Sequence, residues 1–169
     1  MTADSKSIVA AWVAQLNALP LAISDDVRTM LERTVAALSS LLTGDPDPFN
    51  ALWSHADDVT IVGGFGGYER GWQRVKQNTE SAASRFRFGR LLGIELVTLG
   101  ASASGDLAFS VWIERGEVRL AGRDGPTPLT VRVTHIFRRE DGAWKLMHRH
   151  GDQVAQQTID HGMENDIRG

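Results

Sequence analysis

The first part of the chain has apolar residues at helical spacing. Residues 7–19 carry apolar side chains three and four positions apart and are followed by Pro20, which predicts a short N-terminal helix. Residues 24–45 predict a longer helix, because Ser24 can cap it, acidic residues occupy its first turn and Gly44 ends it. Its apolar stripe consists of Val27, Met30, Leu31, Val35, Leu38, Leu41 and Leu42.

Two more helices and a strand are predicted next. Asp47 can cap a short helix that has Pro48 in its first turn. Residues 59–64 then indicate a strand, and residues 71–86 have the length and small-residue content of a helix. One side of this last helix carries Trp72, Val75, Thr79 and Ala82.

After this helix the pattern changes to a period of two, which is typical of strands. The predicted strands cover residues 91–100, 107–118, 129–140 and 143–152, and turn residues separate them. Helices gathered on one side of a curved antiparallel sheet form an α+β domain. The sequence therefore predicts that fold class.

The composition indicates one globular domain without a membrane span. The chain has 169 residues, of which 42% are hydrophobic and 23% are charged. Its apolar runs fall short of the ~18 residues that a spanning helix needs, and its start does not resemble a signal peptide, so we expect a cytoplasmic protein that contacts no membrane. The absence of cysteine excludes disulfides, and a net charge of −3 gives no support for nucleic-acid binding.

Two stretches carry a resemblance to a known family. Residues 51–75 (ALWSHADDVTIVGGFGGYERGWQRV) and 131–152 (VRVTHIFRREDGAWKLMHRHGD) resemble the SnoaL-like, ketosteroid isomerase-like group of the nuclear-transport-factor-2-like (NTF2-like) superfamily. The resemblance implies a cystatin-like, cone-shaped half-barrel, in which a curved antiparallel sheet wraps around helices and leaves a pocket. It covers residues 24–152, with a helical extension at 1–23 and a tail at 153–169 that frays or reaches a partner subunit.

The hairpin of the last two strands allows two registers. A two-residue loop at Asp141 and Gly142 would place His135 opposite His148. A three-residue loop that starts at Glu140 would place His135 opposite Met147, Val133 opposite Arg149 and Arg132 opposite His150. In the relatives that this sequence resembles, the pocket is lined at positions that match His135 or its neighbour and Met147, Arg149 or Gly151, so the resemblance favours the three-residue loop.

That register defines an expected pocket. Its floor holds Val133, His135, Phe137, Met147 and Arg149. Trp112 and Glu114 share one face of the neighbouring strand and are expected to join it. Tyr68 and Trp72 are expected at the mouth. A Glu, a His and an Arg among aromatic and apolar side chains match the make-up of a small-molecule site.

The resemblance implies proton-transfer chemistry of the isomerase, cyclase or dehydratase type on a small carbonyl or aromatic compound. His135 is the expected acid or base, Glu114 its partner and Arg149 the holder of an anion. Ketosteroid isomerase activity itself is not expected, because Gly63 and Gly64 stand where those enzymes carry their base.

Other readings stay open. The three charged residues can form an internal ion network that only satisfies buried charges. The pocket can bind a ligand without catalysis, or the domain can act in oligomerisation. A zinc or iron site at His135, His148, His150 and Asp152 would need the two-residue register, and we expect neither a metal nor a cofactor.

The second face of the last hairpin suggests a protein partner. In the favoured register this outer face carries Thr134, Ile136, Leu146, His148 and His150. Apolar and histidine side chains on an exposed sheet are expected to meet another subunit, and related domains dimerise in this way. The sequence therefore predicts a homodimer with Leu146 or His148 at its interface.

Overall fold

The computed structural model describes residues 3–18, 24–64, 66–86, 88–102, 105–119 and 124–154. The elements are α1 (Ala3–Ala18), α2 (Asp25–Leu42), α3 (Asp47–Asn50), β1 (Thr60–Val62), β2 (Tyr68–Arg70), α4 (Trp72–Arg85), β3 (Arg90–Ala101), β4 (Leu107–Val118), β5 (Thr127–Glu140) and β6 (Ala143–Gln153). The four predicted helices and the final meander of strands are confirmed. The short strand β2 was not predicted, because it follows a glycine-rich loop.

The strands form one curved sheet in the order β2-β1-β6-β5-β4-β3. Neighbours are antiparallel except for β1 and β6, which run parallel. Strands β2 and β3 form the two edges, so the sheet does not close into a barrel. The predicted α+β half-barrel is confirmed.

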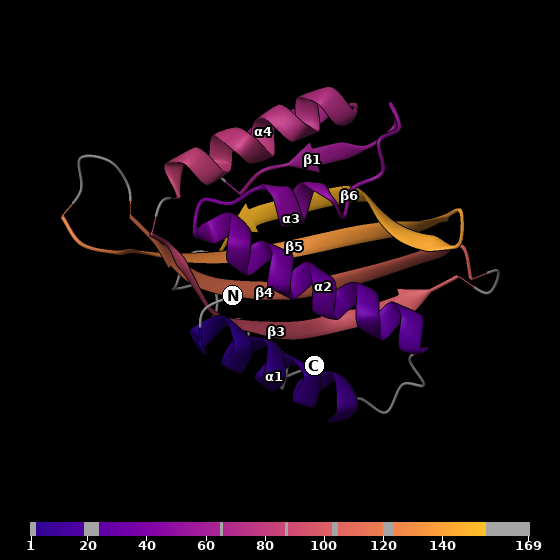
Figure 1. Ribbon diagram of the computed structural model, residues 1–169, viewed down its shortest axis with the longest axis horizontal. Coiled ribbons are helices and arrows are strands. Elements are labelled where there is room, and N and C mark those ends of the chain that lie inside the picture. The colour runs from indigo at the N-terminus through magenta and orange to yellow at the C-terminus, as the bar shows by residue number, and fades with distance from the viewer. Residues whose placement is uncertain are drawn as a thin grey trace, which may run out of the picture.

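The helices gather over one face of the sheet. Figure 1 shows α2 crossing in front of the sheet, α1 lying beside β3 and α4 lying beside β1. The side chains of β4 alternate in burial along the strand, as a strand with one covered face requires. Leu31, Val35 and Leu38 of α2 are buried in this core, and burying each such side chain contributes roughly 1.5–3 kcal/mol.

The first turn of α2 is tied to the β5–β6 hairpin. The Asp26 carboxylate accepts hydrogen bonds from the guanidinium of Arg139 and, at 3.1 Å, from Nε1 of Trp144. The Ser24 side chain and Arg139 hold the pKa of Asp26 well below its usual value. These contacts fix the position of α2, whose far end lines the cavity described below.

The hairpin has the two-residue loop. Asp141 and Gly142 both have positive φ (49° and 78°), and Glu140 pairs with Ala143. Positive φ at both central residues is the signature of a type I′ turn. The prediction of a three-residue loop is therefore wrong.

A β-bulge then changes the register within β6. Phe137 pairs with Leu146, whereas the next residue, Ile136, pairs with His148, so Met147 has no partner in the ladder. As a result His135 faces Arg149, where the sequence analysis placed Met147. The same shift gives Arg132 the partner Asp152 and Val133 the partner Gly151, which corrects both predicted pairs.

The bulge also decides which side chains of β6 enter the core. Leu146 is fully buried beside Phe137, so its predicted place on the outer face of the sheet is wrong. His148 lies on the outer face, where its Nδ1 is 2.7 Å from the hydroxyl of Thr60. His135 is buried on the opposite face, and no group of three or more His, Cys, Asp or Glu close enough to hold a metal occurs among the described residues.

The ends of the chain contribute less to this picture. Residues 155–169 of the predicted tail lie outside the described residues. The same holds for residues 19–23 of the predicted N-terminal extension. No helix within the described ranges is long and apolar enough to cross a membrane.

Candidate functional site

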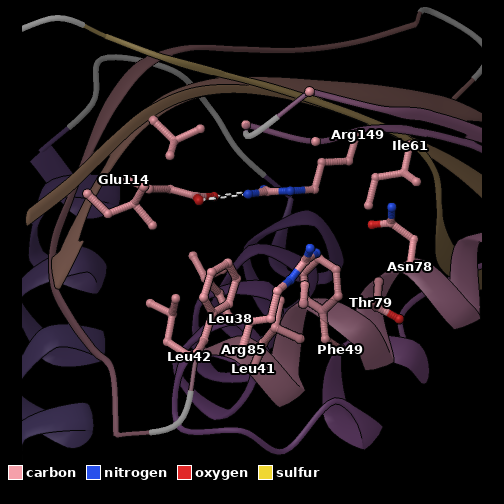
Figure 2. Close-up of a pocket in the computed structure, with 17 residues that line it drawn as sticks. Leu38, Leu41, Leu42, Phe49, Ile61, Asn78, Thr79, Arg85, Glu114 and Arg149 are labelled. Carbon is pink, nitrogen blue, oxygen red and sulfur yellow. Dashed lines mark hydrogen bonds and ion pairs between the residues drawn. The ribbon is translucent and has the colours of Figure 1, made fainter. Parts of the chain in front are cut away.

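A cavity of about 100 Å³ opens between the helices and the covered face of the sheet. We call it the central cavity. Figure 2 shows Leu38, Leu41 and Leu42 below. Asn78 and Thr79 of α4 lie to one side, and Glu114 and Arg149 lie above. The residues that line it are Leu38, Leu41, Leu42, Phe49, Ile61, Gly63, Gly64, Gly66, Asn78, Thr79, Ala82, Arg85, Phe86, Glu114, Leu129, Val131 and Arg149.

An ion pair between Glu114 of β4 and Arg149 of β6 forms one wall of this cavity. Nη1 of Arg149 donates to Oε1 of Glu114 at 2.8 Å, and Nη2 donates to Oε2 at 2.7 Å. The two side chains are only 8% and 13% exposed. A bidentate, nearly buried pair of this kind has a fixed geometry. Removing one partner strongly destabilises the folded protein, because the other charge stays buried and unpaired.

His135 of β5 lies behind the ion pair. Its Nε2 is 2.7 Å from Nη1 of Arg149. A guanidinium can only donate, so Nε2 must accept and the imidazole must be neutral. Burial lowers the pKa of His135 well below 6.5, and the charge of Arg149 lowers it further. His135 is fully buried and is absent from the cavity wall, so it contacts Arg149 and cannot reach a molecule in the cavity.

Trp112 fixes the carboxylate from the same strand. Its Nε1 donates to Oε1 of Glu114 at 2.9 Å, and the two residues are two positions apart on one face of β4. The indole is fully buried and meets the edge of Trp12 of α1, with ring centroids 5.1 Å apart. The predicted convergence of Glu114, His135 and Arg149 beneath Trp112 is therefore present in the structure.

The residues predicted to bind a ligand lie elsewhere. Trp112 and Val133 are buried behind the cavity wall. Phe137 lies at the other end of the sheet, in a groove beside Met30 and Trp144, and Met147 is the bulged residue. Tyr68 is 61% exposed on β2. The ring of Trp72 stacks on that of His55, with the ring centroids 4.2 Å apart. None of these six side chains lines the central cavity.

Helix α4 contributes residues to the cavity that were not predicted from the sequence. Asn78, Ala82 and Arg85 all line the cavity, and their spacing of four and three residues places them on one face of the helix. The Thr79 hydroxyl also lines it and hydrogen-bonds to the buried side chain of Asn50. This spacing was visible in the sequence, but it gave no indication of which element lies opposite.

Similar folds are found among solved structures. A ketosteroid isomerase-like protein from Erwinia carotovora atroseptica is 15% identical, covers 79% of this chain and 99% of its own, and has a TM-score of 0.64. An uncharacterized protein with a cystatin-like fold from Caulobacter vibrioides is 20% identical, with coverages of 80% and 92% and a TM-score of 0.61. An NTF2-like superfamily protein from Salmonella enterica is 16% identical, with coverages of 90% and 99% and a TM-score of 0.62.

At these identities the similarity shows the fold alone. A comparison with curated proteins gave no match. The model of the SnoaL-like domain, in contrast, matches residues 27–156, which is most of the chain. That span contains α2 except for its first two residues, the whole sheet and every residue that lines the central cavity. The chain therefore belongs to the SnoaL-like domain family, within the NTF2-like group of folds.

Proposed function

We propose that the protein binds a compact carbonyl compound in the central cavity and that Glu114 exchanges a proton with it. The observation that carries this proposal is the Glu114–Arg149 ion pair on the wall of an otherwise mostly apolar cavity. Ligand pockets are typically apolar with a few convergent polar groups. The volume of about 100 Å³ is below the ~150 Å³ of a cavity that holds benzene in another protein, so a ligand of that size fits only if part of it extends through the opening toward solvent.

The hydrogen bonds of the ion pair leave capacity for a ligand. An ionised carboxylate has about four acceptor positions, and Trp112 and Arg149 together use three of those on Glu114. The guanidinium has five N–H donors, and its described contacts with Glu114 and His135 use three. The described contacts therefore leave one acceptor position and two donors unused.

This pairing suits proton abstraction next to a carbonyl group. Arg149 would donate to the carbonyl oxygen while Glu114 takes the proton from the adjacent carbon, and the electron pair of the broken C–H bond moves to the oxygen. Return of the proton to another carbon gives an isomer. Transfer of the proton from Glu114 to a hydroxyl on the next carbon, which leaves as water while the enolate electrons form a C=C bond, gives dehydration. His135 takes the role of a positioning residue, because it holds Arg149 and does not reach the cavity.

The test is exchange of α-protons in D2O, followed by proton NMR on cyclopentanone, cyclohexanone and acetophenone. The wild-type protein should accelerate exchange of at least one ketone, and Glu114→Gln should reduce that rate by roughly 10²–10⁴. Glu117→Gln is the matched control, because Glu117 lies on the same strand but pairs with Arg90 away from the cavity. A wild-type rate equal to that of buffer, or an unchanged rate in Glu114→Gln, would refute the proton transfer.

Ligand binding can be tested separately from catalysis. Ala82→Leu places a larger side chain in the cavity, whereas Ser81→Leu adds the same side chain at an exposed position of α4. Only Ala82→Leu should weaken the binding of ketones in NMR titrations. Equal binding by both variants would show that ligands bind elsewhere.

We also propose that the domain forms a homodimer through its outer face. Phe109 is 42% exposed there and pairs with Ile136, and Val111 and Ile113 follow it on the same side of β4. The described helices gather over the opposite face of the sheet (Figure 1). A contiguous apolar patch on a sheet is a typical protein contact. His148 borders this patch as the cross-strand partner of Ile136.

A further inference from the structure

Two polar side chains of α4 line the central cavity, the half-buried Asn78 and Arg85, which is exposed at its rim. Arg85 and Asn78 are seven residues apart, about two helical turns, and both line the cavity. In Figure 2 the guanidinium of Arg85 is directed toward the middle of the site, below the ion pair. Neither side chain has a hydrogen bond or ion pair with another residue in the described part of the chain.

Arg85 and Arg149 therefore differ in whether a carboxylate neutralises their charge. Arg149 is neutralised by Glu114, whereas no described carboxylate lies against Arg85. The lining residues include two guanidiniums and one carboxylate, so their one net positive charge is that of Arg85 at the exposed rim of the cavity. The negative end of the α4 dipole favours a cation in the last turn, so the helix stabilises the charge of Arg85 at this position.

We infer that the ligand of the central cavity carries a carboxylate, which Arg85 binds through its N–H fork while Asn78 donates from its side-chain amide. This inference rests on the proposed binding of a small molecule in the same cavity. A planar carboxylate matches the two parallel donors of a guanidinium. A monoanion also balances the single net charge of the wall, which a doubly charged phosphate would exceed.

The other residues of the cavity indicate that the rest of the ligand is apolar. Leu38, Leu41 and Leu42 of α2 and Phe49 of α3 offer an apolar surface beside Arg85. The substrate class is therefore a compact keto acid or a related small acid, with its carboxylate at Arg85 and its reacting carbonyl toward Glu114 and Arg149. The two arginines then have separate roles, Arg85 in recognition and Arg149 in stabilising the charge that develops during the reaction.

The experiment compares benzoate with benzamide, which have nearly the same shape but differ in charge. Affinities are measured by NMR titration at pH 7 with the wild-type protein, Arg85→Gln and Arg74→Gln. Benzoate should bind the wild type about 10-fold or more tightly than benzamide, as expected for hydrogen bonds to a charged group. Arg85→Gln should reduce the ratio to about 2-fold or less, and Asn78→Ala should give an intermediate ratio.

Arg74→Gln is the matched control, because Arg74 lies on the same helix with a 75% exposed side chain outside the cavity. It should keep the wild-type preference. If both probes bind the wild type equally, or if Arg85→Gln keeps the preference, the carboxylate inference is overturned while binding in the cavity stands. If neither probe binds, the binding proposal fails and this inference fails with it.

Discussion

Nη1 of Arg149 lies 2.7 Å from Nε2 of His135, so a permanently charged guanidinium donates to a fully buried imidazole. The contact requires neutral His135, because a protonated imidazole has no lone pair to accept the hydrogen bond. It also uses one N–H of Arg149 on the side that faces away from the cavity. The histidine therefore orients the arginine toward Glu114, and its protonation would disrupt that arrangement.

This relationship predicts a loss of stability in mild acid. The folded state keeps His135 neutral because burial holds its pKa well below 6.5, whereas the unfolded chain takes up a proton as the pH falls below about 6.5. The unfolded state then binds more protons than the folded state. The free energy of unfolding therefore decreases as the pH decreases below about 6.5, by up to ~1.4 kcal/mol per pH unit, and the full contribution of His135 to stability is present above that pH. Urea unfolding between pH 7.5 and 5.5 measures this slope.

His135→Gln should flatten the slope, because glutamine offers Arg149 an acceptor but does not titrate. His148→Gln is the control. The pKa of His148 is also lowered, by burial and by His150, but this half-buried residue lies on the outer face and should account for a smaller part of the slope. A slope that stays unchanged in His135→Gln would contradict the assignment.

The ion pair predicts a strong asymmetry between single and double substitutions. Arg149→Met leaves Glu114 buried without its partner and should cost about 3–5 kcal/mol of unfolding free energy. Replacing both residues, as Glu114→Leu with Arg149→Met, should recover most of that loss, because no buried charge remains. Urea unfolding of the two single variants and the double variant gives the coupling energy. Additive losses would show that the two side chains do not interact in solution.

The bulge at Met147 predicts that this residue can be deleted. Phe137 already pairs with Leu146, and Ile136 with His148, so removing Met147 leaves a regular ladder with the same partners. The variant should fold, and it should keep the benzoate affinity of the wild type, because Arg85 and Asn78 lie on α4 and Arg149 still faces Glu114. Deletion of Thr134 in the central strand β5 is the control, because Thr134 has a regular partner on each neighbouring strand. Its loss would move the following side chains of β5 to the opposite face of the sheet, so this variant should not fold. Circular dichroism and NMR titration check both variants.

The outer face predicts a dimer that one charge can dissociate. The wild type should behave as a dimer at micromolar concentration in light scattering, with an interface above the ~1,000 Å² of a specific contact. Phe109→Arg should yield a folded monomer, because Phe109 is 42% exposed and the substitution leaves the core intact. Tyr68→Arg, at an exposed position on the far edge strand, should leave the dimer unchanged. A wild-type monomer would refute the proposal.

The sequence alone determined the elements and part of the site. The helical period of the α2 stripe and the period of two in β4 are local properties, and they correctly placed Trp112 and Glu114 on one face. The meeting of Glu114 with His135 and Arg149 was also predicted, although from the wrong register. The predicted and observed registers differ by two residues at this point of β6, and because side chains alternate with a period of two, both point Arg149 to the same side.

Only the tertiary structure decided how β6 passes from one register to another and which side chains surround the cavity. The bulge at Met147 lets Leu146 enter the core while His148 stays outside, and no pattern in the strand itself specifies that step. Asn78 and Arg85 belong to the site because α4 packs beside β1 and across from α2, which brings together segments far apart in the sequence. Local periodicity shows which face of an element is apolar, but which element covers that face depends on packing between distant parts of the chain.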